Sequence, residues 1–179
     1  ASPTLATIDG QKTIVQITQK GCVGVNPDDG KLLWEYKREA EYHDVVCTSP
    51  VISGNLIATS VGFGDGMDCF KIEKSGSSFQ AKQVFSKKEI ANDNGGIVLV
   101  GKHVYGFHMK RFWECIDIET GAVAWTSARK GLTAGSVIAA DGRLYVLAED
   151  SGEVAMLSAS PEGYKEISKF KIPELSTLR

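Results

Sequence analysis

Asp28-Asp29-Gly30-Lys31-Leu32-Leu33-Trp34 and Glu119-Thr120-Gly121-Ala122-Val123-Ala124-Trp125 are the two stretches that decide the fold of this chain. Each contains a Gly-x-x-x-Trp core and follows an alternating, strand-like run. The two tryptophans lie 91 residues apart. This separation is about twice the 40–50-residue period of propeller blades, so a repeat is expected between them.

The chain aligns with itself four times, which predicts repeats at approximately 1–46, 47–91, 92–133 and 134–179. Each unit has four short alternating runs, and the first two runs of each unit meet at a turn glycine: Gly10, Gly54, Gly101 and Gly142. No stretch keeps apolar residues at helical spacing over three turns. Alternation interrupted by turn residues at intervals of about 8–12 positions predicts strands throughout.

Matched positions in the units predict how the strands stack. The third runs correspond at Gly24, Cys69, Cys115 and Met156, and the fourth runs carry the aromatic residues Trp34, Phe85, Trp125 and Phe170. Four short antiparallel strands in ~45 residues are typical of a propeller blade, and a blade must stack on neighbours because it cannot bury both faces alone. We therefore predict an all-β chain, a single propeller segment over 1–179, whose four aromatic rings anchor the blades. Burying each ring contributes roughly 1.5–3 kcal/mol.

Composition excludes two classes of partner. The chain has 179 residues, is 42% hydrophobic and 23% charged, and carries a net charge of −2, so it lacks the basic surface that nucleic acid requires. No apolar run approaches the ~18 residues of a membrane helix. The four cysteines have no metal-site spacing. We predict neither nucleic-acid binding nor a membrane span.

The two tryptophan stretches resemble the blades of quinoprotein-like propellers, whose pyrroloquinoline-quinone-type repeat reads roughly A-L-D-x-x-T-G-x-x-x-W. Residues 115–121, Cys-Ile-Asp-Ile-Glu-Thr-Gly, match closely, and residues 24–30 match with Asn for Asp and Asp for Thr. The resemblance implies a ring of seven or eight blades, of which this chain holds four. It predicts a fragment of a larger propeller or a half-propeller that pairs with another chain, with a closed four-bladed ring as the alternative.

In propellers, the loop after the outermost strand shares a face with the loop between the second and third strands. Polar side chains in these loops are our candidates for binding a ligand or partner, because binding residues favour loops on a rigid scaffold. The other interpretation is that they only form turns and solvated loop tips. The candidates are His43, Asp44, Asn92, Asp93, Asn94, His108, Arg111 and Arg129.

The resemblance also raises the alternative of a quinone-dependent dehydrogenase. Such enzymes hold the quinone and a calcium ion with Glu, Asn and Asp ligands, a stacking Trp and, in many members, a vicinal Cys pair. This sequence has no Cys-Cys pair, and neither 92–94 nor 65–68 supplies the six to eight oxygens that calcium prefers. Trp113 is a candidate stacking ring, but its place on a strand also suits core packing. No catalytic residue and no metal ligand is assigned.

The sequence therefore predicts a non-catalytic β-propeller scaffold that presents loop faces to a protein or small ligand, without a cofactor. A protein partner and self-association of half-propellers are both expected. The resemblance implies an extracytoplasmic location, in the bacterial periplasm or cell envelope, since related members include a scaffold lipoprotein of outer-membrane assembly. The alternative is a fragment of a dehydrogenase that uses pyrroloquinoline quinone and calcium.

Overall fold

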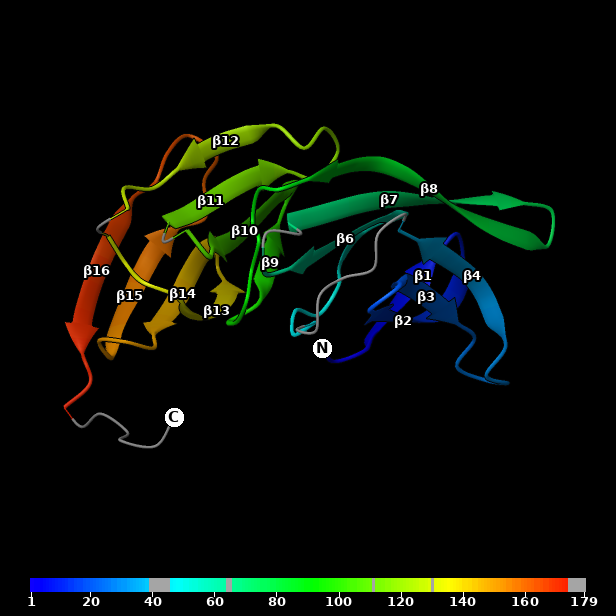
Figure 1. Ribbon diagram of the computed structural model, residues 1–179, viewed down its shortest axis with the longest axis horizontal. Coiled ribbons are helices and arrows are strands. Elements are labelled where there is room, and N and C mark those ends of the chain that lie inside the picture. Colours follow the sequence, from blue (N-terminus) through cyan, green and yellow to red (C-terminus); the bar gives the residue numbers. More distant parts are fainter. Residues whose placement is uncertain (39–45, 64–65, 111, 130, 174–179) are drawn as a thin grey trace.

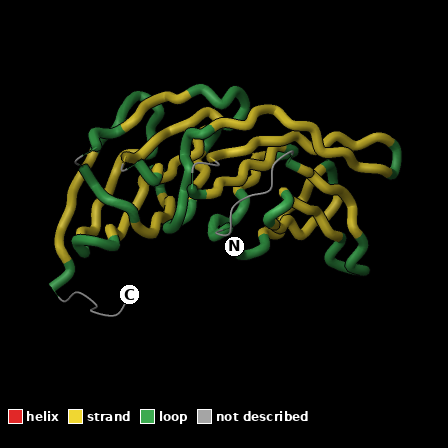
Figure 2. The backbone as a smooth tube through the Cα atoms, viewed as in Figure 1, coloured by secondary structure: helices red, strands yellow, loops and turns green. Residues whose placement is uncertain are grey.

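The computed structural model describes residues 1–38, 46–63, 66–110, 112–129 and 131–173. Within these ranges the chain forms only strands, arranged as four antiparallel sheets of four consecutive strands each (Figures 1 and 2). The first sheet contains β1 (Thr4–Ile8), β2 (Gln11–Thr18), β3 (Gly21–Val25) and β4 (Leu32–Lys37). The second contains β5 (Val51–Ser53), β6 (Leu56–Val61), β7 (Gly66–Ser75) and β8 (Ser78–Lys87). The third contains β9 (Ile97–Val100), β10 (His103–His108), β11 (Phe112–Asp117) and β12 (Val123–Thr126). The fourth contains β13 (Gly135–Ala140), β14 (Arg143–Ala148), β15 (Glu153–Ser158) and β16 (Glu166–Lys171). The predicted all-β fold is confirmed.

The hairpins that open the sheets follow from their turn residues. Asp9 and Gly10 have φ of 46° and 79°, and Asp141 and Gly142 have φ of 49° and 69°. Two consecutive positive φ values are what a type I′ turn requires, and Asp-Gly is among its preferred dipeptides. The twist of this turn matches that of the flanking strands, so each dipeptide fixes the register of its hairpin.

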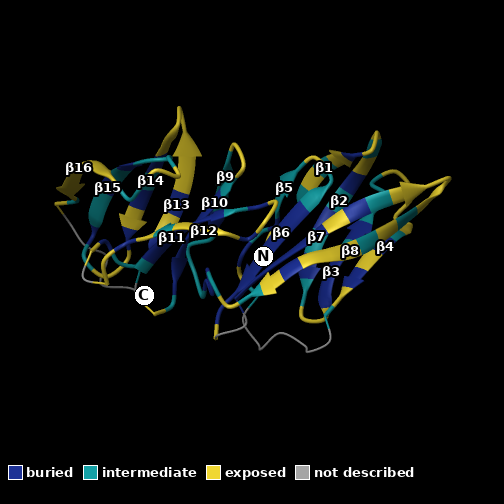
Figure 3. Cartoon of the chain, turned by 90° about the horizontal axis from the view of Figure 1, so that it is seen from above, coloured by how far each residue is buried: buried dark blue, intermediate teal, exposed yellow. Residues whose placement is uncertain are grey.

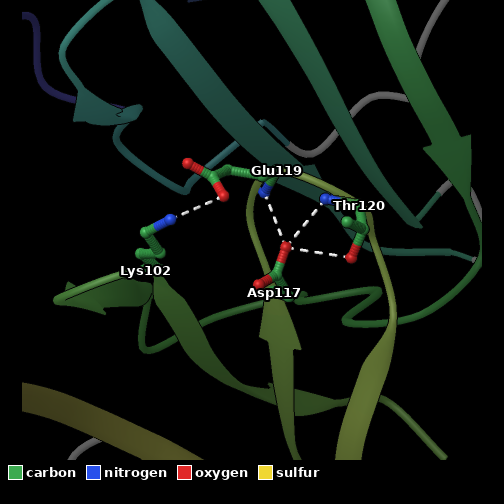
Figure 4. Close-up of polar contacts among 4 residues, drawn as sticks. All are labelled: Lys102, Asp117, Glu119 and Thr120. Carbon is green, nitrogen blue, oxygen red and sulfur yellow. Dashed lines mark hydrogen bonds and ion pairs between the residues drawn. The ribbon is translucent and has the colours of Figure 1, made fainter.

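The Asp-x-x-Thr-Gly motif of the third sheet is a self-contained turn between β11 and β12. One oxygen of the Asp117 carboxylate accepts hydrogen bonds from the backbone N–H groups of Glu119 and Thr120, at 2.9 and 2.8 Å, and from the Thr120 hydroxyl at 2.9 Å (Figure 4). The N–H of Gly121, at φ +69°, donates to the Asp117 carbonyl. Lys102 pairs with Glu119 at 2.8 Å beside this turn. The motif therefore fixes the conformation of the turn that precedes β12, the outer strand that contains Trp125.

The first sheet builds the same turn with different side chains. The Asn26 side-chain oxygen accepts from the N–H of Asp28 at 3.0 Å, and the N–H of Gly30 donates to the Asn26 carbonyl at 2.9 Å. Asp29 accepts from the N–H of Lys31, as Thr120 does from Ala122 in the third sheet. Asn for Asp and Asp for Thr are thus equivalent substitutions here, because each keeps an acceptor in place.

This equivalence makes a prediction for Asp117. Asp117→Asn keeps a side-chain acceptor, as Asn26 does, and should change the free energy of unfolding by less than about 0.5 kcal/mol. Asp117→Ala removes the acceptor of three hydrogen bonds and should cost about 1–2 kcal/mol. Urea unfolding of both variants checks this, and equal losses in the two variants would contradict the assignment.

The four sheets stack face to face in a row that follows an open arc, with the first and last sheets at opposite ends (Figure 1). An apolar core lies between each pair of neighbours (Figure 3). Buried positions alternate with more exposed ones in the first and last sheets, as along β2 and β14, whereas β6 and β10 of the middle sheets are buried at nearly every position, because those sheets are covered on both faces. The innermost strands β1, β5, β9 and β13 line a common groove of about 710 Å³. This chain is therefore a row of propeller-type blades, and not the closed four-bladed ring considered as an alternative.

Each sheet has an anchor face, which carries Trp34, Phe85 or Trp125 in the first three sheets, and an opposite receiving face. In the first interface, the Trp34 ring packs edge-on against Phe70 of the second sheet, with ring centroids 5.8 Å apart. Tyr36 stacks on the same ring at 4.2 Å. Gly24 lies under the indole, where a Cβ would fall 2.1 Å from a Trp34 ring carbon. Only glycine leaves room for this anchor.

The next two interfaces repeat the arrangement. Phe85 is buried with Ile116 and Val104 of the third sheet, and its ring covers Gly121. Trp125 packs against Tyr164 of the fourth unit and donates from its indole nitrogen to the Ser160 carbonyl at 2.8 Å. The three anchors therefore join each sheet to the one that follows it in the chain.

The prediction that Phe170 is the anchor of the fourth sheet is wrong. Strand pairing opposes Gly24 to Trp34, Cys69 to Phe85, Cys115 to Trp125 and Met156 to Ser168, which confirms the third-strand correspondence and assigns the anchor position to Ser168. Phe170 lies two residues further on, opposite Val154, and 62% of its surface is exposed. Aromatic character alone favours Phe170 in the sequence, whereas the β-bulge between Met156 and Leu157 fixes the register and places Ser168 at this position.

Candidate functional site: the loop face

The loop face comprises the loops that follow the fourth strand of one sheet and those between the second and third strands. The two kinds of loop do lie together, as the propeller arrangement predicts. The N–H of Met109, after β10, donates to the carbonyl of Ala91, after β8, at 2.9 Å. Three of the predicted site residues, His43, Asp44 and Arg111, lie outside the described residues. Of the other five, Asp93, Asn94, His108 and Arg129 lie on this face, and Asn92 lies buried beneath it.

Asn92 is a buried structural link and not a free ligand. Its amide nitrogen donates to the Phe107 carbonyl at 3.0 Å, and its side-chain oxygen accepts from the Thr48 hydroxyl and the Gly96 N–H. Its backbone N–H donates to the Ser60 hydroxyl at 3.2 Å. With only 1% of its surface exposed, Asn92 joins the second and third sheets beneath the loop face.

Asp93 holds an exposed aromatic residue in place. Its carboxylate accepts from the N–H of Phe63 at 3.0 Å, and its carbonyl accepts from the Cys47 thiol at 2.6 Å. Gly62 makes this approach possible, because a Cβ there would fall 1.7 Å from the Asp93 carboxylate oxygen. Phe63 itself has φ +55°, an unfavourable backbone conformation for a bulky residue, and 55% of its surface is exposed.

His108 is buried in its neutral form at the edge of the face. Its Nε2 lies 3.1 Å from the Lys88 carbonyl and its Nδ1 accepts from the N–H of Lys110 at 3.0 Å, which together require the Nε2–H tautomer. The centroids of the His108 and Phe112 rings lie 4.7 Å apart, and the Arg129 guanidinium lies 5.9 Å from the centroid of the same Phe112 ring. Burial lowers the pKa of His108.

The lowered pKa makes stability depend on pH. Below about pH 6.5 the unfolded chain binds a proton at His108 that the folded chain excludes, so stability falls as pH falls through that value. Between pH 7.5 and 5.5 this contribution reaches at most about 1.4 kcal/mol. We expect the free energy of unfolding of His108→Gln, measured with urea, to fall less than that of the wild type when the pH is lowered from about 7.5 to 5.5. Parallel pH profiles would contradict the assignment.

A small acidic pocket of about 280 Å³ opens between the loops of the third and fourth sheets. Asp93, Glu149 and Asp150 contribute its carboxylates, and Phe107 and Met109 contribute its apolar wall. Asn94 spans the two sheets at its rim, where its amide donates to Glu149 at 2.6 Å. The face therefore presents the exposed Phe63 ring and the acidic pocket, which Asp93 links, and the exposed Arg129 cation beside Phe112.

These residues do not fit the quinone and calcium of the enzyme alternative. The Asn92 oxygen already accepts two protein hydrogen bonds, and Trp113 is fully buried in the core between the third and fourth sheets. No group of three or more His, Cys, Asp or Glu side chains in the described ranges is arranged to hold a metal ion.

Phe63 is the site residue that sequence reasoning missed. The sequence feature that indicates its exposure is its position between Gly62 and Gly64, since a large apolar residue in a glycine-rich turn has few neighbouring side chains to pack against. Among the predicted residues, the structure groups Asp93 with Asn94 around the pocket and joins His108 to Arg129 through Phe112. It removes Asn92 from the accessible surface.

Comparison with protein families supports this resemblance. A family model described as outer membrane protein assembly factor BamB, of the PQQ-type repeats, matches residues 1–126. No curated protein matches the chain.

Solved structures share the fold at low sequence identity. BamB from Moraxella catarrhalis has a TM-score of 0.65 and 15% identity, over 94% of this chain and 52% of its own. Hsv2 from Kluyveromyces lactis has a TM-score of 0.63 and 15% identity, over 99% and 58%. The Cps50 (Swd1) β-propeller domain from Myceliophteria thermophila has a TM-score of 0.61 and 16% identity, over 94% and 57%. The chain therefore spans about half the length of each of these proteins.

Proposed function

This chain belongs to the family of the outer membrane protein assembly factor BamB, and we propose from this that it is a non-catalytic propeller scaffold whose loop face binds a protein partner. The observation that carries the proposal is Phe63, a large apolar side chain exposed at 55% on a turn held by Asp93. Rigid, exposed aromatic residues are frequent hot spots of protein interfaces. The unfavourable backbone of Phe63 adds support, because such strain clusters at binding sites.

The family also supports a location. The matching description refers to outer-membrane assembly, so we place this protein in the bacterial periplasm or cell envelope, where its partner would be a protein of that assembly process. Nowhere in the described part of the chain is there a helix of the length and apolarity that a membrane crossing requires.

The binding role is tested by photo-crosslinking in cells that produce the protein natively. A photoreactive residue at Lys110 or Asp150, both exposed on the loop face, should yield a crosslink to a discrete protein, whereas one at Lys102 or Asp141, on the opposite rim, should not. Phe63→Ala should weaken the Lys110 and Asp150 crosslinks strongly, since loss of a hot-spot ring costs about 2 kcal/mol or more, roughly 30-fold in affinity.

The stability of Phe63→Ala is the matched control. Its side chain is largely exposed, so its free energy of unfolding should stay within about 0.5 kcal/mol of the wild type. Crosslinks that arise equally from both rims, or that survive Phe63→Ala, would contradict a binding role for the loop face. Turnover of an alcohol or sugar by the purified protein with pyrroloquinoline quinone and calcium would overturn the non-catalytic assignment.

A further inference from the structure

Ile90, three residues before Asp93, has an unusual backbone conformation for its residue type. Its φ is +43°, in the left-handed region, where a β-branched residue is rare because its Cβ is crowded. Its side chain is nevertheless fully buried, and Gly106 of β10 leaves room for it, since a Cβ at Gly106 would fall 2.5 Å from an Ile90 methyl carbon. Backbone strain of this kind persists only where the surrounding structure holds it, and it is frequent at functional sites.

Two polar side chains hold Ile90 from opposite sides. The N–H of Ile90 donates to a carboxylate oxygen of Glu114, on β11 of the third sheet, at 2.7 Å. The Ile90 carbonyl accepts from the hydroxyl of Ser60, on β6 of the second sheet, and the same hydroxyl oxygen accepts from the N–H of Asn92 at 3.2 Å. Ile90 is thereby fixed between the two sheets, and so is the direction in which residues 91–93 leave it.

Glu114 is an energetically costly residue for this place in the sheet. Only 4% of its surface is exposed, and burial raises the pKa of its carboxyl group. Packing does not require a carboxylate here, because the matched position of the fourth sheet is occupied by Ala155, which is also buried. Glu114 lies opposite Gly106 in the strand register, so one residue pair supplies both the room for Ile90 and the acceptor for its N–H. The carboxylate therefore satisfies a buried donor that an apolar side chain would leave unpaired.

The second sheet has a buried carboxylate at the same register position, one residue before the position opposite the anchor. This residue is Asp68, which binds the guanidinium of Arg38, in the segment that follows β4. Glu114 binds the N–H of Ile90, in the segment that follows β8. In both sheets this position thus holds the chain where it leaves the preceding sheet.

The loop that begins at Ile90 carries a residue of the loop face. Asp93 accepts from the N–H of Phe63 at 3.0 Å and lines the acidic pocket. If the loop left Ile90 in another direction, the Asp93 carboxylate would move away from Phe63, and the turn that exposes the phenyl ring would lose its support.

We propose that Glu114 is the positioning residue of the loop face. By accepting from the N–H of Ile90, it fixes residues 90–93 in the conformation in which Asp93 supports Phe63. Glu114 is buried and acts through this loop, without touching a partner itself. Its effect on partner binding rests on the function proposed above, whereas its effect on the conformation of the loop does not.

The experiment is hydrogen exchange of single backbone amides, followed by NMR on the isotope-labelled chain. Glu114→Met keeps the approximate size of the side chain and removes the acceptor. It should speed the exchange of the Ile90 and Phe63 N–H groups by about 10-fold or more, because a buried donor left unpaired favours opening of the loop. Glu114→Gln retains a side-chain oxygen as acceptor and should keep both rates within about threefold of the wild type.

Two controls separate a local effect from a general loss of stability. The N–H of Ile72, which donates to the Asn55 carbonyl at 2.8 Å in the second sheet, is the internal reference and should be unaffected. Glu119→Met makes the same chemical change at an exposed position and should alter none of the three rates. Unchanged exchange at Phe63 in Glu114→Met would overturn the proposal. Equal acceleration at Ile72 would overturn it too, because Glu114 would then support the whole fold and not this loop.

Photo-crosslinking adds the functional readout. With the photoreactive residue at Lys110, Glu114→Met should weaken the crosslink to the partner, as Phe63→Ala does, and Glu114→Gln should restore it. A crosslink of full strength in Glu114→Met would contradict the positioning role. If the wild type gave no crosslink at all, the proposed function would fail, and the exchange rates at Ile90 and Phe63 would still decide whether Glu114 positions the loop.

Discussion

Trp34→Ala is expected to lower the free energy of unfolding by about 3–5 kcal/mol, as truncation of buried Trp residues does elsewhere. The indole is buried between β3 and the second sheet, directly over Gly24 and against Phe70. Neither neighbour can fill the vacated space, because Gly24 has no side chain and Phe70 is held by its stack with Tyr36. Urea unfolding followed by circular dichroism measures the loss.

Phe63→Ala is the control for this variant, since it removes an aromatic ring that is largely exposed. A loss below about 1 kcal/mol for Trp34→Ala would show that the ring does not anchor the first sheet.

Arg38→Met is expected to cost about 3–5 kcal/mol, because it leaves a buried carboxylate without its cation. Positions 34, 36 and 38 point to the same side of the chain, and the Arg38 Nε lies 2.6 Å from the Asp68 carboxylate in the second sheet. Asp68 is fully buried and Arg38 is 13% exposed, so water screens the pair little. The measurement is again urea unfolding, at pH 7.

A second substitution separates charge from packing. Asp68→Leu in the Arg38→Met background removes the buried carboxylate and should recover most of the lost stability, since an apolar pair is often as stable as a buried ion pair. If the double variant were less stable than Arg38→Met, Asp68 would have a structural role independent of Arg38.

Much of the fold follows from local sequence. The Asp-Gly dipeptides at 9–10 and 141–142 fix hairpins whatever lies around them, and the Asp117 motif is closed by its own hydrogen bonds. The correspondence of Gly24 with Cys69, Cys115 and Met156 also holds, because all four lie on the third strand opposite the anchor position.

Features that depend on contacts between residues distant in sequence are harder to predict. The bulge next to Met156 assigns the anchor position to Ser168 instead of Phe170, and a bulge has no clear sequence signal. Strands β7 and β8 are ten residues long, whereas the sequence predicts only short runs in each unit. The outer halves of these strands are polar and resemble a loop in sequence. They pair with each other, and β8 also lies beside β4 (Figure 1).

The same limit applies to the candidate site. Asn92, Asp93 and Asn94 are adjacent polar residues, and nothing local distinguishes the buried link, the residue that holds Phe63 and the residue that reaches Glu149. These roles arise from the neighbouring sheets. Phe63 is recognisable only once its exposure is known.

The most direct test of the stacked-blade account is a double-mutant cycle between Trp34 and Phe70, with Trp34→Phe and Phe70→Leu as mild single changes. The rings meet across the first interface, so we expect a coupling free energy of about 0.5–3 kcal/mol. Trp34→Phe combined with Trp113→Phe, in a separate core cluster, should be additive within about 0.5 kcal/mol. Additivity for Trp34 and Phe70 as well would contradict the docking of each sheet on the next.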